Sequence, residues 1–152
     1  MHVAIDADKM NIVSLSITDE RSHENREFRK VLNPIADKVK MVYGDLLRSR
    51  SNFNFLHNRE IEAVIPPREN SSILSRGSPY RAKTVRRIRR AGLDEWKKEV
   101  DYGKRWKVEI FFSALKRVVG ETIKTRKMRY QIHEAVMKVY CYLLMRKNTV
   151  VT

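Results

Sequence analysis

The sequence has a single cysteine and no long apolar run, and both absences narrow what the protein can be. Cys141 is the only cysteine among 152 residues, so an intramolecular disulfide and a zinc site built from several thiolates are excluded. No segment approaches the ~20 apolar residues that a membrane-spanning helix needs. The first residues also lack the basic start and long apolar stretch of a signal peptide. A cytoplasmic protein with no membrane partner is expected.

Acidic residues are scarce in the second half of the chain. Residues 1–75 carry 11 Lys/Arg and 11 Asp/Glu, whereas residues 76–152 carry 21 Lys/Arg and 7 Asp/Glu. The whole net charge of +14 therefore lies in the C-terminal half. Such an excess costs self-repulsion unless a polyanion binds it, and a merely solvated surface would mix the signs more evenly. The asymmetry predicts that residues 76–152 contact the phosphate backbone of a nucleic acid.

The densest basic segment is 81–90, which holds six cations and no acid. A helix of this composition contacts phosphates without reading base sequence; the alternative is a solvated helix. A general RNA-binding protein is disfavoured because the aromatic and glycine signatures of RNA modules are absent. The residues expected to bind DNA are Arg81, Lys83, Arg86, Arg87, Arg89, Arg90, Arg68, Arg117, Lys124, Arg126 and Lys127.

Alternating apolar residues and wider apolar stripes predict an α/β domain in which strands are interrupted by helices and a helical part follows. Strands are predicted over 3–7, 11–18, 38–43 and 61–65, in one mixed sheet. Helices are predicted over 22–32, 52–58, 96–119 and 127–146. A further helix should begin at Pro79, after Ser78 as N-cap, and stop at Gly92.

Four polar residues in the predicted helix 96–119 fall on one side of it. Tyr102, Arg105, Glu109 and Lys116 lie within an arc of about 60° at roughly 100° per residue. The carboxylate can hold a divalent metal, while the cations grip phosphates on either side. The alternative is a surface helix with an Arg105–Glu109 pair worth only ~0.3 kcal/mol, which leaves Tyr102 and Lys116 unexplained.

A second carboxylate, Asp45, follows Gly44 at the carboxyl end of a predicted strand. Ligands of α/β sheets bind at that edge. The alternative is an ordinary turn, because Gly-Asp is a common turn pair.

The spacing of these four residues matches the YREK signature of a large group of prokaryotic insertion-sequence transposases. Tyr102, Arg105, Glu109 and Lys116 stand at all four positions, and residues 105–117 are similar to the glutamate helix of that group. Residues 42–45, 65–70 and 18–24 also resemble its other segments. The chain therefore resembles a DDE transposase of this group, which implies an RNase H-like core of mixed sheet and helices and DNA as partner.

By that resemblance Asp45 and Glu109 are the second and third acids of a DDE triad. They would approach each other in space and ligate Mg²⁺ (or Mn²⁺), with paired metals stabilising the attacking and leaving oxygens of the phosphate. Tyr102, Arg105 and Lys116 would position the DNA ends. The implied function is metal-dependent DNA strand cleavage and transfer in DNA transposition.

The sequence departs from that group in two places. The first aspartate should stand on a strand upstream of the hairpin 3–18, and Asp6 falls within the hairpin itself. After Asp45, residues 46–51 differ from the pattern of the group. We therefore expect 1–152 to be one partial catalytic-core domain, an N-terminally truncated copy lacking its first strand, without activity alone. The alternative is a catalytically inactive DNA-binding remnant whose protein partner is a second copy or a full-length transposase.

Overall fold

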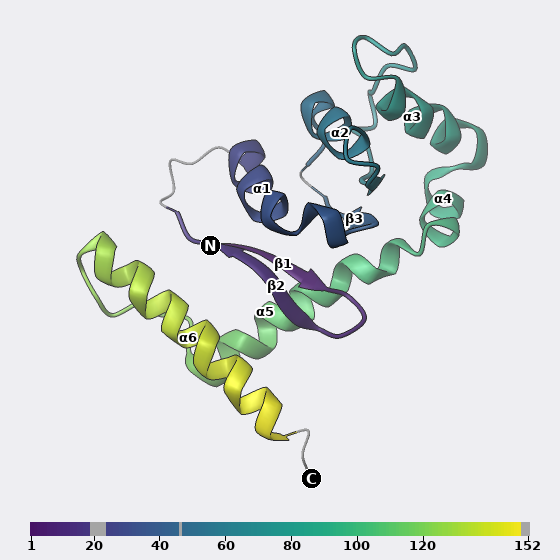
Figure 1. The fold of residues 1–152 in the computed structure, drawn as a ribbon. Helices are drawn as coiled ribbons and strands as arrows, with labels where there is room; N and C mark the ends of the chain where they lie inside the picture. The colour runs from purple at the N-terminus through teal and green to yellow at the C-terminus, as the bar shows by residue number, and fades with distance from the viewer. Residues whose placement is uncertain (19–23, 46, 150–152) are drawn as a thin grey trace. The chain divides into compact units, whose positions relative to one another are not determined.

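The computed structural model describes residues 1–18, 24–45 and 47–149, and the chain divides into two compact units (Figure 1). Unit 1 consists of residues 1–22 and 106–152, and unit 2 of residues 23–105. The structure does not define how the two units lie relative to each other, so each is described by itself. The expectation that the chain forms a single domain therefore stays a prediction.

Unit 1 begins with a β-hairpin, confirmed much as the sequence predicts it. Strand β1 (His2–Asp6) pairs antiparallel with β2 (Asn11–Ser16), with Val3 opposite Leu15. The turn is closed by the Asp6 carboxylate, whose Oδ1 accepts the amides of Asp8 and Lys9 at 2.9 and 3.0 Å. These bonds, that of Lys9 first, lower the pKa of Asp6. Asp6 therefore holds a turn.

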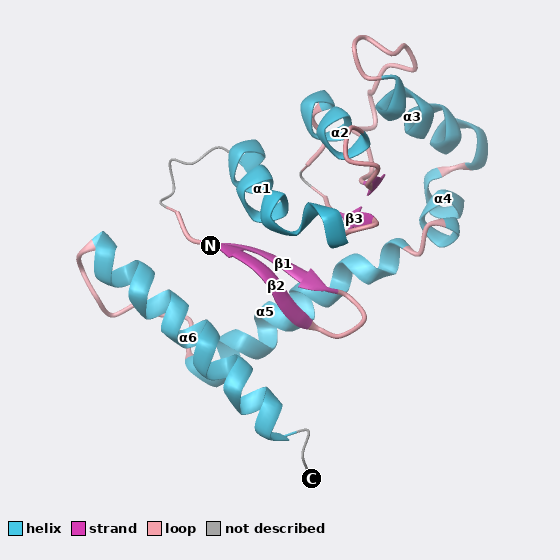
Figure 2. Cartoon of the chain, viewed as in Figure 1, coloured by secondary structure: helices cyan, strands magenta, loops and turns pink. Residues whose placement is uncertain are grey.

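Two helices complete unit 1 and cover the hairpin. Helix α5 (Trp106–Val119) and helix α6 (Met128–Thr149) share a core in which Phe111 meets Tyr142 edge to face, with ring centroids 5.3 Å apart. Phe111 is 1% exposed, and the hairpin residues Ile5, Ile12 and Leu15 pack on this core. Figure 2 shows the hairpin as the two long magenta strands.

Unit 2 is built on a short parallel strand pair and a crossover helix. Strand β3 (Met41–Tyr43) pairs with β4 (Glu62–Val64), and α2 (Arg50–His57) connects them. Helix α2 is capped by Ser49, whose hydroxyl accepts the Asn52 amide at 3.2 Å. Phe53 and Leu56 of α2 are buried together with Ile65 against α1 (Glu24–Leu32) and the 3₁₀ helix η1 (Asn33–Lys38).

Two further helices and a 3₁₀ turn end unit 2. Helix α3 (Pro79–Ala91) starts at Pro79 and stops at Gly92, as predicted; Gly92 has φ +91°, which glycine adopts without strain. Ser78 is the N-cap residue, as predicted, although its side chain makes no capping hydrogen bond. Helix α4 (Leu93–Glu99) and η2 (Tyr102–Arg105) follow, and Trp96, Tyr102 and Val64 are buried together.

Two sequence predictions are corrected. The helix predicted over 96–119 is three elements, because Asp101 takes a left-handed conformation (φ +49°) that asparagine and aspartate tolerate best and that ends α4. In the described residues, the four predicted strands pair as two two-stranded sheets instead of one. Periodicity identifies a strand, whereas its pairing partner depends on long-range packing. The start predicted for helix 22–32 lies outside the described residues.

Candidate functional site

The Gly44–Asp45 segment directly after β3 is where unit 2 gathers its predicted catalytic side chains. Asp45 Oδ1 accepts from Arg48 Nη2 at 2.6 Å, and Arg48 Nε donates to the Asp45 carbonyl at 2.7 Å. Asp45 Oδ2 lies 3.9 Å from Arg105 Nη1. The carboxylate is 42% exposed and thus stands between two guanidinium groups at the edge of the unit.

Tyr102 approaches the same segment from the other side. Its hydroxyl donates to the Gly44 carbonyl at 3.3 Å, and its ring is buried beside Trp96. Of the four signature residues, Arg105 therefore approaches the predicted acid Asp45 and Tyr102 bonds its neighbour Gly44, across 58 or more residues of sequence. They do so from the 3₁₀ turn η2, so the unbroken polar stripe predicted for one helix is wrong.

The other two signature residues belong to unit 1. Glu109 is exposed in the first turn of α5, where a carboxylate is favoured by the helix dipole. Lys116 lies two turns later and pairs with Glu121, whose pKa it lowers. Because Asp45 and Glu109 are in different units, the prediction that their carboxylates approach each other stays a prediction.

The cations of α3 divide into two groups by what they contact. Arg81, Arg87 and Arg89 are tied to protein groups: Arg81 and Arg89 donate to Ser71, and Arg87 forms a two-pronged pair with Glu99 of α4. That pair raises the pKa of Arg87 and lowers the pKa of Glu99. Arg87 therefore clamps α3 to α4, a role that sequence reasoning missed.

Lys83, Arg86 and Arg90 form the second group, which we call the α3 stripe. All three are exposed, and none makes an ion pair among the described residues; Arg86 donates to the Ala82 carbonyl of its own helix. Their spacing of three and four residues places them within about 60° on one side of α3. The α3 stripe is thus an open row of positive charge on a packed helix.

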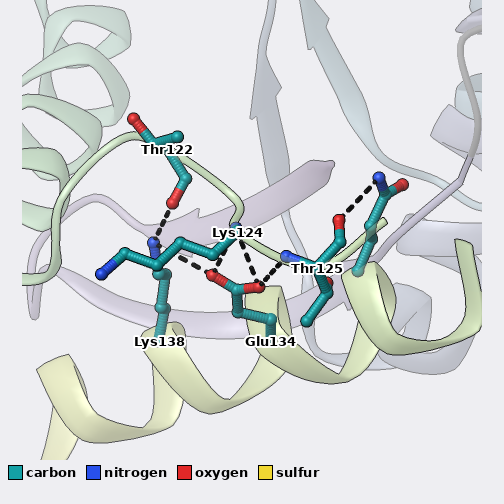
Figure 3. A network of polar contacts seen from close by, with 6 residues as sticks. Thr122, Lys124, Thr125, Glu134 and Lys138 are labelled. Atoms are coloured by element: carbon teal, nitrogen blue, oxygen red, sulfur yellow. Dashed lines mark hydrogen bonds and ion pairs between the residues drawn. The ribbon is translucent and has the colours of Figure 1, made fainter. Parts of the chain in front are cut away.

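The second basic cluster lies in the connection between α5 and α6 of unit 1. Figure 3 shows how Glu134 of α6 holds this connection: its carboxylate accepts the amides of Lys124 and Thr125 at 3.0–3.1 Å. Lys138 donates to the Thr122 carbonyl at 2.6 Å. The amide of Lys124, and then that of Thr125, lowers the pKa of Glu134. The exposed cations of this part are Lys124, Arg126 and Lys127, with Arg117 in the last turn of α5.

The candidate acids of each unit have partners of their own in the structure. Among residues 1–18, 24–45 and 47–149, no three His, Cys, Asp or Glu side chains come together as metal ligands. Both oxygens of Asp45 face guanidinium groups, which oppose a divalent cation. The carboxylate of Asp6, in unit 1, has its Oδ1 engaged by the hairpin amides of Asp8 and Lys9.

The chain is thus a basic α/β protein in which an arginine approaches the acid at the end of a strand and a tyrosine bonds the residue before it. Residues 1–144 match the family of transposase DDE domains, and the chain belongs to this family. No curated protein and no solved structure matches it. Membership indicates a role in transposition, with DNA as partner and, as is typical of the family, a divalent metal. No helix in the described part of the chain is long and apolar enough to cross a membrane.

Proposed function

We propose that this chain binds double-stranded DNA as the core of an insertion-sequence transposase, acting on DNA of the nucleoid. The observation that carries the proposal is the α3 stripe, in which Lys83, Arg86 and Arg90 are exposed on one helix face without a carboxylate partner. Three such cations repel one another, and a phosphate backbone removes that repulsion while releasing counterions. Contacts of these cations with phosphates do not read base edges, so we expect binding through the α3 stripe to depend little on the DNA sequence.

Two features support the YREK group within the family. The first is the spacing of the signature residues, and the second is the contact of Tyr102 and Arg105 with Gly44–Asp45. An acid at the end of a parallel strand, followed by a crossover helix, also supports an RNase H-like core. On this proposal Asp45 and Glu109 are metal ligands, and Tyr102, Arg105 and Lys116 hold DNA ends.

A second candidate function is DNA binding without cleavage, and the surroundings of Asp45 favour it. Arg48 belongs to the segment 46–51 that departs from the pattern of the group, and it places a guanidinium on the predicted metal ligand. With Arg105 on the other oxygen and no cluster of three ligands among the described residues, Mg²⁺ would have to displace cations and recruit donors. We therefore expect the chain by itself to occupy DNA without cutting it.

Two assays on the purified chain separate the candidates. Binding to a labelled duplex and to a random RNA of equal length measures the DNA preference, and the proposal expects tighter binding to the duplex. Incubation with supercoiled DNA carrying candidate ends and Mg²⁺ or Mn²⁺ measures nicking. Nicking that disappears in both Asp45→Ala and Glu109→Ala would establish catalysis and refute the binding-only function. Equal affinity for RNA and duplex would refute the DNA proposal.

A further inference from the structure

Four arginines converge on one hollow of unit 2 that lies apart from Asp45. The hollow has a volume of about 420 Å³ and is lined by Arg50 of α2, Arg68 and Arg76 of the loop after β4, and Arg81 of α3. Asn70 and the carboxylate of Glu69 also line it. The volume falls in the range of roughly 300–1,000 Å³ found for small-molecule sites, so a phosphate with part of its sugar fits.

The wall of this hollow is held in place by hydrogen bonds. Arg81 donates to Ser71 Oγ at 2.7 Å and to the Arg48 carbonyl at 3.3 Å. Arg89 donates to the Ser71 carbonyl at 3.2 Å, and Asn54 of α2 donates to the Gly77 carbonyl at 2.8 Å. The loop is therefore fixed to both α2 and α3, and the site does not have to be assembled when an anion arrives.

The charges around the hollow are out of balance. Arg50, Arg68 and Arg76 are exposed and make no ion pair among the described residues, and Glu69 is the only carboxylate in the lining. Burial, and after it the charges of Arg50 and Arg68, lower the pKa of Arg81, so these guanidinium groups are close enough to repel one another. Arginine cannot relieve this repulsion by losing its proton, so an anion has to do so.

We propose that this hollow is a phosphate-binding site that takes one phosphate group of DNA, as an internal phosphodiester or as the phosphomonoester at a strand end. A planar guanidinium group donates two parallel hydrogen bonds to a pair of phosphate oxygens. Several arginines around one cavity can surround a single tetrahedral anion, whereas they are poorly placed to lie along the surface of a duplex. The DNA source rests on the proposed function, whereas the phosphate chemistry does not. The site includes Arg50 and Arg68, so phosphate contacts extend into the half of the chain without net charge.

Titration calorimetry of the full chain with inorganic phosphate tests the site. The variant is Arg50→Gln with Arg68→Gln; the matched control is Lys38→Gln with Lys40→Gln, which removes two exposed charges of unit 2 away from the hollow. Wild type and control should bind phosphate saturably, and the variant should raise Kd about tenfold or more. No saturable binding by wild type, or equal Kd for variant and control, would overturn the proposal. Circular dichroism checks folding, and Arg76→Gln replaces the variant if it fails to fold.

Duplexes with and without a 5′-phosphate then identify the source. If the 5′-phosphate increases the affinity of the wild type and this increase is abolished in Arg50→Gln/Arg68→Gln, the site binds the terminal phosphate. If the wild type binds both duplexes with equal affinity, and the variant binds both more weakly by the same factor, the site binds an internal phosphate. If the chain binds inorganic phosphate but no duplex, the proposed function fails and the site stands. If duplex binding is the same in variant and control, the assignment of a DNA phosphate to the site fails and the proposed function stands.

Discussion

Removing the α3 stripe should change the salt dependence of DNA binding by a predictable amount. The perturbation is Lys83→Gln, Arg86→Gln and Arg90→Gln together, which deletes three exposed cations and keeps good helix formers. Each phosphate contact adds about 0.9 to the slope of log Kd against log salt, so the slope should fall by about 2.7. If the wild type makes five or six contacts, its affinity falls about three decades between ~50 and ~200 mM salt. The fall in affinity over the same salt range should be about 1.6 decades smaller for the variant.

The assay is fluorescence anisotropy of a labelled duplex over that salt range. The control is Arg26→Gln, Lys38→Gln and Lys40→Gln, three exposed cations of unit 2 outside α3 that lower the net charge equally. The control should keep nearly the whole slope, because counterion release depends on contacts and not on total charge. An equal change of slope in both triple variants would refute the assignment of DNA binding to α3. So would a flat salt response of the wild type.

Three smaller predictions concern the contacts that hold unit 1 in shape. Asp6→Asn should make the free energy of unfolding less dependent on pH below 3.8, the ordinary pKa of Asp6. The lowered pKa of Asp6 in the folded protein contributes stability that is present above 3.8 and is lost as pH falls through the lowered pKa. Acid unfolding followed by circular dichroism checks this. Glu134→Gln should speed hydrogen exchange of the Lys124 and Thr125 amides, because it weakens the charge-assisted hydrogen bonds that these amides donate to residue 134. Unchanged exchange rates would contradict the hydrogen bonds drawn in Figure 3. Phe111→Ala should lower the free energy of unfolding by about 3–5 kcal/mol, measured by urea denaturation; a loss under about 1 kcal/mol would mean that the α5–α6 core is not packed as described.

The sequence predicts the local elements well because their signals are local. Alternation of Val13 and Leu15 with serines identifies strand β2, although Val13 is exposed and Ile12 packs on the core instead. Pro79 and Gly92 bound α3. The sequence also places Asp45 after a strand, where the structure has it. Such features depend on residues within one turn or one strand, where side-chain periodicity and backbone preference decide the outcome.

What could not be predicted depends on packing between distant segments. Asp101 breaks a helix whose apolar periodicity continues across it, and no local pattern indicates that Tyr102 turns toward Gly44. Arg48 is three residues from the predicted acid Asp45 in sequence, yet only the structure shows that its guanidinium donates to the carboxylate. Likewise Arg87 is one of six cations in 81–90, and its pairing with Glu99 distinguishes it from its neighbours.

The most direct test of DNA binding through unit 2 is chemical-shift mapping of the ¹⁵N-labelled chain with an unlabelled duplex at low salt. The proposal predicts that the amides and guanidinium groups shifting most are those of Lys83, Arg86 and Arg90 and of the arginines around the hollow. The signals of Lys38 and Lys40 should stay in place. No shifts at saturating duplex, or shifts centred on Lys38 and Lys40 with α3 unaffected, would contradict it.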